Sequence, residues 1–362
     1  MDPKAWLATR KGLFTLSEQP RGWGIEQVHF LGDPVSAVLC DPRDGWLYCA
    51  LNLGHFGTKL HRSTDHGRSW HEVATPAFPE KPEGSGDSLE WKVQQIWTLE
   101  ADPVGPGGTL WAGTLPGGLF RSTDGAASWQ LVRSLWDRPE RGEWFGGGYD
   151  VPGIHSICID PLSPGRILLG ISCGGVWVSD DQGANWRLSA EGMRATYLPP
   201  GEVANPNVQD PHRIVACRAD PGTLWCQHHD GIWRSSDAGQ NWQAVTGVAP
   251  SAFGFAVAAH PVNPEVAWFV PAAADQCRVP VNGAFVVNCT RDGGRSFETQ
   301  SRGLPQEPSY DIVYRHGLDV DASGQRLLAG ATSGRVWSSA DGGDHWQELA
   351  AVLPPIYAVR LG

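Results

Sequence analysis

Short hydrophobic runs alternate with turn residues along the whole chain, and the runs fall into units of four. The clearest unit starts with an apolar stretch ending at Asp102-Pro103, continues through residues 110–114 and 118–122, and closes with 129–132. Runs of about four to eight such residues, bounded by Gly, Pro, Asn, Asp or Ser, are typical of β-strands. The pattern therefore predicts four short strands per unit.

The turn between the third and fourth predicted strands carries a repeated motif, Ser/Thr-x-Asp-x-Gly-x-x-Trp/Phe. Six copies occur, 49 to 59 residues apart, with their aspartates at Asp65, Asp124, Asp181, Asp237, Asp292 and Asp341. We call these segments the box turns. An Asp carboxylate accepts hydrogen bonds from nearby backbone N–H groups, and Gly tolerates positive φ. The second copy has Ala126 in place of Gly. We expect each motif to fasten a hairpin and to take no part in catalysis.

Four-stranded repeats of this length are typical of propeller blades. Residues 6–9, 13–16 and 25–30 predict the second, third and fourth strands of a further unit, and residues 355–361 predict its missing first strand. We expect residues 357–361 to pair beside 13–16, which leaves no open edge. The prediction is an all-β, seven-bladed β-propeller of four-stranded antiparallel blades, one domain over residues 1–362. A six-bladed propeller is the alternative.

Composition agrees with this picture and narrows the partners. The chain has 45 Gly, 28 Pro and 18 Trp, which suits many tight turns with aromatic side chains packed between sheets. Its net charge of −11, without any Lys/Arg run, argues against a nucleic-acid partner. A run of about 18 apolar residues, as a membrane helix requires, is missing. The N-terminal residues lack a secretory signal pattern, so we expect a cytoplasmic protein.

The six motifs are identified as Asp-boxes, also called BNR repeats. Proteins with such boxes include sialidase-like glycosyl hydrolases, xyloglucanases, sortilin-type receptors and photosystem II assembly factors. The chain resembles bacterial sialidase-like Asp-box proteins over nearly its full length, through stretches such as Asn52-Leu-Gly-His-Phe-Gly, Trp144-Phe-Gly-Gly-Gly-Tyr-Asp and Tyr314-Arg-His. The resemblance implies a hydrolase. True sialidases carry a Phe/Tyr-Arg-Ile-Pro motif that this sequence lacks, which argues against a true sialidase.

In a propeller, the connections away from the box turns share one face, and sites are commonly built on such connections. The long ones here are 75–92, 134–152, 190–213 and 271–282. His155 and His316 each lie five residues before the Asp that ends a first strand, so we expect both at the mouth of the central channel. The predicted catalytic residues are His155, His316, Arg315 and Asp150. The predicted substrate-binding residues are Arg10, Lys11, Trp91, Tyr149 and Arg278.

Histidines also suggest a metal, because imidazole suits iron and copper. The candidate ligands are His55, His155, His228, His229 and His316, and a divalent metal ion is the candidate cofactor. A further histidine, His212, lies in one of the long connections. Asp210 nearby serves equally well as a general acid or base or as a turn cap. A single histidine at a strand end is more often a satisfied polar group than a ligand.

Three functions remain open on this sequence. The first is a glycosidase-like hydrolase that acts on a small polar or carbohydrate-like substrate at the channel mouth opposite the box turns. The second is a metal-dependent enzyme with a His-lined central channel. The third is a non-catalytic recognition or assembly scaffold with a protein partner. Long polar connections on one face favour an enzyme, whereas a scaffold needs no polar cluster.

Overall fold

The computed structural model describes residues 4–20, 22–104, 107–306 and 308–362, and these form seven four-stranded antiparallel sheets. The protein is thus an all-β, seven-bladed β-propeller, as the sequence predicted. The chain forms two compact units, one of Met1–Val35 with His212–Gly362 and one of Ser36–Pro211. The single domain over residues 1–362 stays a prediction. Among the described residues, no helix is long and apolar enough to span a membrane.

The first unit holds four sheets. Their strands, in spatial order, are β28 (Ile356–Leu361), β1 (Lys4–Thr9), β2 (Gly12–Gln19) and β3 (Gly22–His29); β16 (Pro211–Ala216), β17 (Leu224–His228), β18 (Gly231–Ser235) and β19 (Gln243–Val245); β20 (Gly254–Ala259), β21 (Ala267–Pro271), β22 (Val287–Thr290) and β23 (Glu298–Gln300); and β24 (Leu318–Val320), β25 (Leu327–Gly330), β26 (Val336–Ser339) and β27 (Gln347–Glu348). A short 3₁₀ helix, η4 (Val281–Gly283), interrupts the connection from β21 to β22.

The second unit holds three sheets and most of the helical turns. Its strands are β4 (Val35–Cys40), β5 (Leu47–Asn52), β6 (Thr58–Ser63) and β7 (His71–Val73); β8 (Gln95–Ala101), β9 (Leu110–Leu115), β10 (Leu119–Ser122) and β11 (Gln130–Leu131); and β12 (Ile154–Ile159), β13 (Ile167–Ile171), β14 (Gly175–Ser179) and β15 (Arg187–Leu188). The helical turns are η1 (Gly54–Phe56), α1 (Arg133–Trp136), η2 (Pro139–Glu143) and η3 (Pro206–Val208).

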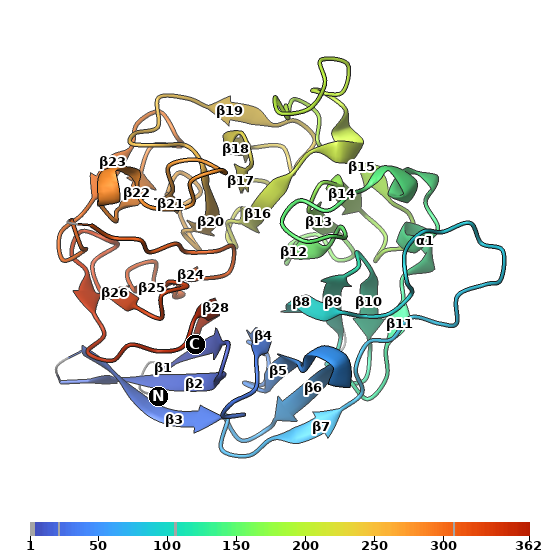
Figure 1. Ribbon diagram of the computed structural model, residues 1–362, viewed down its shortest axis with the longest axis horizontal. Helices are drawn as coiled ribbons and strands as arrows, with labels where there is room; N and C mark the ends of the chain where they lie inside the picture. The colour runs from blue at the N-terminus through green and yellow to red at the C-terminus, as the bar shows by residue number, and fades with distance from the viewer. Residues whose placement is uncertain (1–3, 21, 105–106, 307) are drawn as a thin grey trace. The chain divides into compact units, whose positions relative to one another are not determined.

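The C-terminal strand completes the sheet that the N-terminal strands begin. β28 pairs antiparallel with β1, in a register that places Leu7 opposite Val359 (Figure 1). The prediction that residues 357–361 pair beside 13–16 was wrong by one strand. Residues 13–16 belong to β2, which occupies the other edge of β1, where Leu7 faces Phe14. The strand at residues 4–9 therefore lies between them, and the spare strand joins the open edge.

The box turns connect the third and fourth strands of six sheets and share one hydrogen-bond pattern. In the copy after β18, the Ser235 hydroxyl donates to Asp237 Oδ1 at 2.8 Å and accepts from the Gly239 N–H at 2.9 Å. Asp237 Oδ1 also accepts from the Asn241 N–H at 2.9 Å. Ala126 adopts φ 67°, which L-residues disfavour, and its methyl group is fully buried. Each turn is closed by its own residues, as predicted.

Tryptophan side chains fill the space beside the central strands of the sheets. Indole rings on the second or third strand are fully buried at Trp111, Trp177, Trp225, Trp268 and Trp337. In the first unit, Trp268 and Trp337 belong to one buried cluster that spans the β20–β23 and β24–β27 sheets. Aromatic packing between neighbouring blades is therefore what the high Trp content supplies. The eight cysteines, all within the described ranges, form no disulfide.

Candidate functional site

The register of the β16–β19 sheet separates two ends of the blade. Leu224 faces Ser235 at the end that carries the box turn, and His228 faces Gly231 at the other end. Strands β17 and β18 have five residues each, which puts these ends on the order of 13 Å apart. His212, the second residue of β16, and His229, in the turn between β17 and β18, both lie at the end away from the box turn.

Seven side chains of the first unit gather at this end, and we call them the His212 cluster. Phe255, which is 2% exposed, lies at its centre. The His212 ring stacks on Phe255 with centroids 4.5 Å apart and planes 15° apart. Phe253 and Tyr314 meet the same ring edge-on at 5.4 and 5.0 Å. The full set is His212, His229, Phe253, Phe255, Arg278, Tyr314 and Arg315, from three consecutive sheets.

A backbone hydrogen bond fixes the protonation of His212. Its Nδ1 lies 2.7 Å from the Gly254 carbonyl oxygen, and a carbonyl can only accept, so Nδ1 carries the proton. In the neutral ring, Nε2 then holds the lone pair. His228 shows the opposite arrangement, because its Nδ1 accepts the Asp230 N–H at 3.1 Å. Of these two histidines in their neutral state, His212 is therefore the one whose Nε2 is unprotonated and can accept a proton or ligate a metal.

The segment that presents the Gly254 carbonyl is held on both sides. Gln227 of the neighbouring sheet donates from Nε2 to the Ala252 carbonyl at 2.9 Å. The Ala272 N–H donates to the Phe253 carbonyl at 2.8 Å. A Cβ at residue 254 would lie 2.5 Å from the Val270 carbonyl oxygen, so the close approach of these strands requires glycine. The orientation and tautomer of His212 are therefore fixed by a tightly held backbone carbonyl rather than by another side chain.

Two arginines add positive charge to the His212 cluster. The guanidinium carbons of Arg278 and Arg315 lie 5.2 and 5.5 Å from the Phe255 ring centre, within cation–π range. Arg278 also donates to Asp275 Oδ1 at 2.5 Å. Burial acts against the charge of Arg278, but hydrogen bonds with Asp275 and Tyr314 raise the pKa of its guanidinium above the usual value. The two guanidinium groups therefore offer N–H donors to a polar group, while Asp275 balances the charge of Arg278.

Two histidines of the His212 cluster carry nitrogens that could ligate a metal. The His212 and His229 ring centroids lie 5.5 Å apart. His212 is buried, at 3% exposed, and His229 is half-buried. The metal-binding roles of His55, His155, His228, His229 and His316 stay predictions.

In the second unit, three of the predicted site residues lie close together in the structure. The Trp97 ring makes edge contacts with Tyr149 at 5.1 Å and with His155 at 5.4 Å. His155 is fully buried, with Nδ1 2.9 Å from the Ser156 hydroxyl. Tyr149 is 48% exposed, and Asp150 beside it is exposed as well. His155 is thus buried against the Trp97 ring, whereas Tyr149 and Asp150 face solvent.

The remaining predicted residues occupy separate places. Trp91 packs edge-on against Trp136 and donates from Nε1 to Asp87 at 2.8 Å, which makes it part of a folded loop. Arg10 and Lys11 form the exposed turn between β1 and β2. His55 lies exposed on η1. His316 is buried, and its carbonyl accepts the Val359 N–H of β28 at 2.8 Å.

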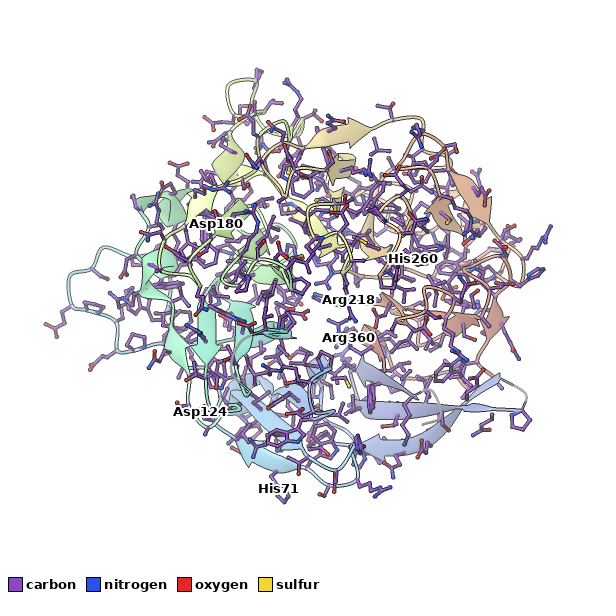
Figure 2. The ribbon with its side chains drawn as sticks, turned by 180° about the vertical axis from the view of Figure 1, so that it is seen from behind. His71, Asp124, Asp180, Arg218, His260 and Arg360 are labelled. Atoms are coloured by element: carbon purple, nitrogen blue, oxygen red, sulfur yellow. The ribbon has the colours of Figure 1, made fainter. Side chains whose placement is uncertain are left out.

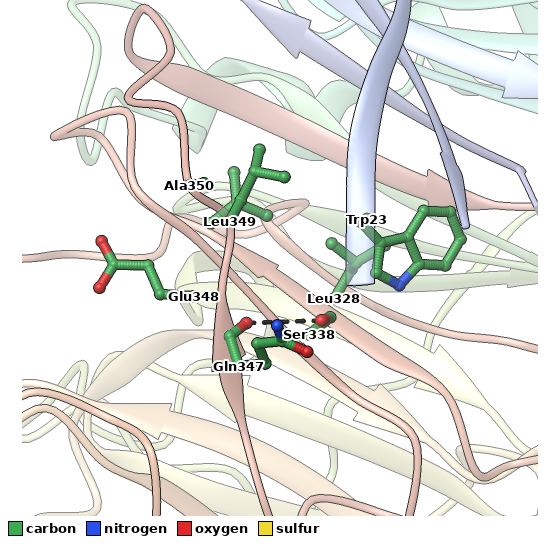
Figure 3. Close-up of a pocket in the computed structure, with 8 residues that line it drawn as sticks. Trp23, Leu328, Ser338, Gln347, Glu348, Leu349 and Ala350 are labelled. Carbon is green, nitrogen blue, oxygen red and sulfur yellow. Dashed lines mark hydrogen bonds between the residues drawn. The ribbon is translucent and has the colours of Figure 1, made fainter. Parts of the chain in front are cut away.

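A small pocket of the first unit lies elsewhere. It is lined by residues of β3 and of the β24–β27 sheet, among them Trp23, Leu328, Gln347 and Glu348 (Figure 3). Ser338 donates within it to the Gln347 carbonyl at 3.4 Å. Its acidic residue, Glu348, is paired with Arg335 at 2.6 Å. Because Glu348 is already paired, this pocket is a weaker candidate for a catalytic or binding site than the His212 cluster.

Sequence reasoning missed the centre of the His212 cluster. Phe253 and Phe255 lie around a glycine at the start of a predicted first strand, and nothing local marks them as functional. A signal did exist in Asp210-Pro-His212, two ligand-type residues separated by a proline at the end of the longest connection. Arg278, Arg315 and His229 were predicted, and the structure places all three in the cluster.

Comparison with known proteins finds weak but extended similarity. No family model matches the chain. It is 25% identical over 365 residues to a probable oligoxyloglucan-reducing end-specific xyloglucanase of Neosartorya fischeri, covering 91% of this chain and 41% of that protein. It is 23% identical over 210 residues to a sialidase of Bacteroides fragilis, covering 48% and 38%. The chain therefore spans about two fifths of the length of each of these curated relatives.

Solved structures agree on the fold. An ancestral GH74 enzyme aligns with a TM-score of 0.60 and 19% identity, over 87% of this chain and 38% of that one. YCF48 bound to a D1 peptide aligns with a TM-score of 0.54 and 14% identity, over 94% and 87%. The chain is a seven-bladed β-propeller that is similar in sequence to a curated xyloglucanase and a bacterial sialidase, and similar in fold to a GH74 enzyme and to YCF48.

Proposed function

We propose that this protein is a glycosidase-like hydrolase that binds a carbohydrate-like substrate at the blade ends opposite the box turns. The observation that carries the proposal is the fixed tautomer of His212 inside a cluster of aromatic and arginine side chains. A neutral imidazole with an oriented lone pair can accept a proton from a sugar hydroxyl or a water. Arg278 and Arg315 would hold polar substituents, and partly exposed aromatic faces would stack on a sugar ring.

The curated relatives support the same class of reaction. Three of the four curated proteins that resemble this chain are named as xyloglucanases, and the fourth is named as a sialidase. Because the Phe/Tyr-Arg-Ile-Pro motif is missing, we propose a neutral glycan rather than a sialic acid as the substrate. The solvent-facing Tyr149 and Asp150 are a second proposed contact for substrate, and His155, His316 and Arg315 keep their proposed catalytic roles.

The experiment is a hydrolysis assay on the full chain. Reducing-end-labelled xyloglucan oligosaccharides and a chromogenic sialoside are incubated with wild type, His212→Gln and the matched control His71→Gln. His71 projects outward from the strand β7 at the outer edge of its sheet (Figure 2). We expect cleavage of the glucan by wild type, at least a ~100-fold loss in His212→Gln, as for removal of a general acid or base, and no change in His71→Gln.

Two outcomes would reject this proposal. One is that wild type neither cleaves nor binds either glycan, by product analysis and by affinity electrophoresis. The other is that His212→Gln cleaves as fast as wild type, which would place the chemistry away from the His212 cluster. Cleavage of the sialoside in preference to the glucan would retain the hydrolase and overturn the choice of substrate.

A second candidate is a non-catalytic peptide-binding scaffold. The observation favouring it is length, because the YCF48 structure is covered over 87% of its chain, whereas the GH74 enzyme is covered over 38%. The net charge of −11 would select a basic peptide. Fluorescence anisotropy with a Lys/Arg-rich and a Glu/Asp-rich peptide of equal length tests this. Binding of the basic peptide together with no glycan cleavage would favour the scaffold over the hydrolase.

A further inference from the structure

We propose that Gln227 is the positioning residue of the His212 cluster, because its one side-chain amide holds the backbone around both histidines of the cluster. Gln227 belongs to β17 and is 1% exposed. Its Nε2 donates to the Ala252 carbonyl at 2.9 Å and lies 3.2 Å from the carbonyl oxygens of His228 and Gly231. All of these residues belong to the first unit. The inference rests on the proposed function, since positioning matters to the reaction only if His212 takes part in it.

The three contacts determine which end of the Gln227 amide faces the backbone. A carbonyl oxygen can only accept a hydrogen bond, so the atom that meets three carbonyls is the amide nitrogen and not the amide oxygen. This nitrogen carries two hydrogens, so one of them is shared between two carbonyls. Among uncharged side chains, only Asn and Gln offer two N–H donors from one atom, and Gln has the longer reach.

The contact with Ala252 acts on His212 through the backbone that leads into β20. The carbonyls of Ala252 and Gly254 both face the β16–β19 sheet, where the first accepts from Gln227 and the second accepts from His212 Nδ1 at 2.7 Å. The Phe253 carbonyl between them accepts from within its own sheet. Successive peptide groups of an extended chain alternate in direction, so fixing one carbonyl fixes the next but one. The amide of Gln227 therefore orients the acceptor that sets the His212 tautomer.

The other two contacts hold the turn that carries His229. His228 and Gly231 flank this turn and face each other in the register of β17 and β18. Their carbonyls meet the same amide nitrogen, so both ends of the turn are tied to one atom. The His229 ring meets the His212 ring edge-on, with centroids 5.5 Å apart. One amide group therefore holds the backbone on both sides of this ring contact.

The acceptor matters because His212 has the less common tautomer. In water, the neutral imidazole of histidine carries its proton mainly on Nε2, whereas the Gly254 carbonyl holds the proton of His212 on Nδ1. A carbonyl that is free to turn away would let the proton move to Nε2. The lone pair that the proposed reaction requires would then lie on the wrong nitrogen. Loss of the Gln227 amide should therefore lower the fraction of His212 in the competent form without removing any group that touches substrate.

The test removes the amide while keeping the length of the side chain. Gln227→Met eliminates both donors, and Gln243→Met makes the same change at an exposed position of β19 in the same sheet. Long-range ¹H–¹⁵N spectra of the imidazole rings are recorded on the full chain at about pH 8, where a ring with the ordinary pKa of about 6.5 is neutral. The His212→Gln protein identifies the His212 signals by their absence.

We expect the Nδ1-protonated pattern of His212 in wild type and in Gln243→Met, and its loss in Gln227→Met as the proton moves to Nε2. Glycan cleavage should show a fall in kcat on the order of 10- to 100-fold, the scale of cost for a displaced catalytic group. KM should change little, because Arg278 and Arg315 keep their places. Gln227→Glu, which keeps the shape of the side chain and turns a carboxylate oxygen toward the carbonyls, should behave like Gln227→Met.

Two results would overturn the proposal. One is a folded Gln227→Met protein in which His212 keeps its proton on Nδ1. The other is that circular dichroism finds both Gln227 variants unfolded, because Gln227 would then serve the fold rather than the site. If wild type cleaves no glycan, the proposed function fails, while the imidazole spectra still decide whether Gln227 positions His212.

Discussion

The two ends of the blades in this protein are built by different rules. At the box turns, the hydrogen bonds that all six copies share join residues two to four positions apart, as between Ser235, Asp237 and Asn241. At the opposite end, His212, Phe255 and Arg315 come from three different sheets and are far apart in the sequence. The repeated end is a local device for stability. The other end is unique in this chain, and chemistry can be placed there without disturbing the repeat.

The largest effect on stability should come from removing β28, the strand that completes the sheet of β1, β2 and β3. Deleting residues 356–362 removes β28, whose Ile356 and Val359 are fully buried. Losing the burial of these two side chains alone costs about 3–6 kcal/mol, and the backbone bonds to β1 are lost as well. We expect the truncated chain to aggregate or to melt far below wild type in a thermal scan. A melting temperature within a few degrees of wild type would show that the pairing of β28 with β1 contributes little to stability.

The next largest effect on stability should be seen when the buried Phe255 is truncated, in contrast to truncation of the exposed Phe56. Phe255→Ala removes a 2% exposed ring that five other side chains of the cluster contact, whereas Phe56→Ala changes a ring that is 75% exposed on η1. We expect Phe255→Ala to lose about 3–5 kcal/mol of stability, the usual cost of such a core truncation. Phe56→Ala should be nearly neutral. Equal melting temperatures for the two variants would contradict the packing described for the cluster.

A single box turn should matter less. Asp237→Ala removes the acceptor for the Asn241 backbone N–H and for its side-chain amide. At about 0.5–1.5 kcal/mol for each hydrogen bond, the expected loss is about 1–3 kcal/mol. Glycan cleavage should be unchanged, because this turn lies at the other end of the blade. Loss of cleavage in a folded Asp237→Ala protein would contradict the separation of the two ends.

The smallest effect should appear in acid. The Ser128 side chain and backbone N–H both donate to Asp124 and lower the pKa of its carboxyl to about 2, and Ser296 does the same for Asp292. An unfolded Asp has a pKa of about 3.9. A lowered pKa in the folded state means that the stabilisation is present above about pH 4 and is lost as pH falls toward 2. Melting temperatures of wild type and Asp124→Asn should therefore converge over this range, and a constant difference would contradict the assignment.

The sequence by itself determined the elements that depend on neighbours along the chain. Each box turn follows from a Ser or Thr, an Asp and a Gly or Ala within five residues, and the spare strands at the two ends predicted a seventh sheet. The partner of the last strand was misplaced by one position, from β2 to β1, because the alternating pattern of a strand does not say which of its edges is free.

Tertiary structure decided where the chemistry lies. Arg278, Arg315 and His229 were predicted because their residue types and loop positions are informative. Phe255 carries no such mark, since a phenylalanine in a first strand is ordinary core. His212 gains its role from the carbonyl of Gly254, 42 residues away, whose oxygen accepts a hydrogen bond from the Nδ1–H and so leaves the lone pair of the neutral ring on Nε2. Local hydrogen bonds repeat with the sequence that encodes them, whereas the tautomer of a histidine depends on an acceptor that only folding brings within reach.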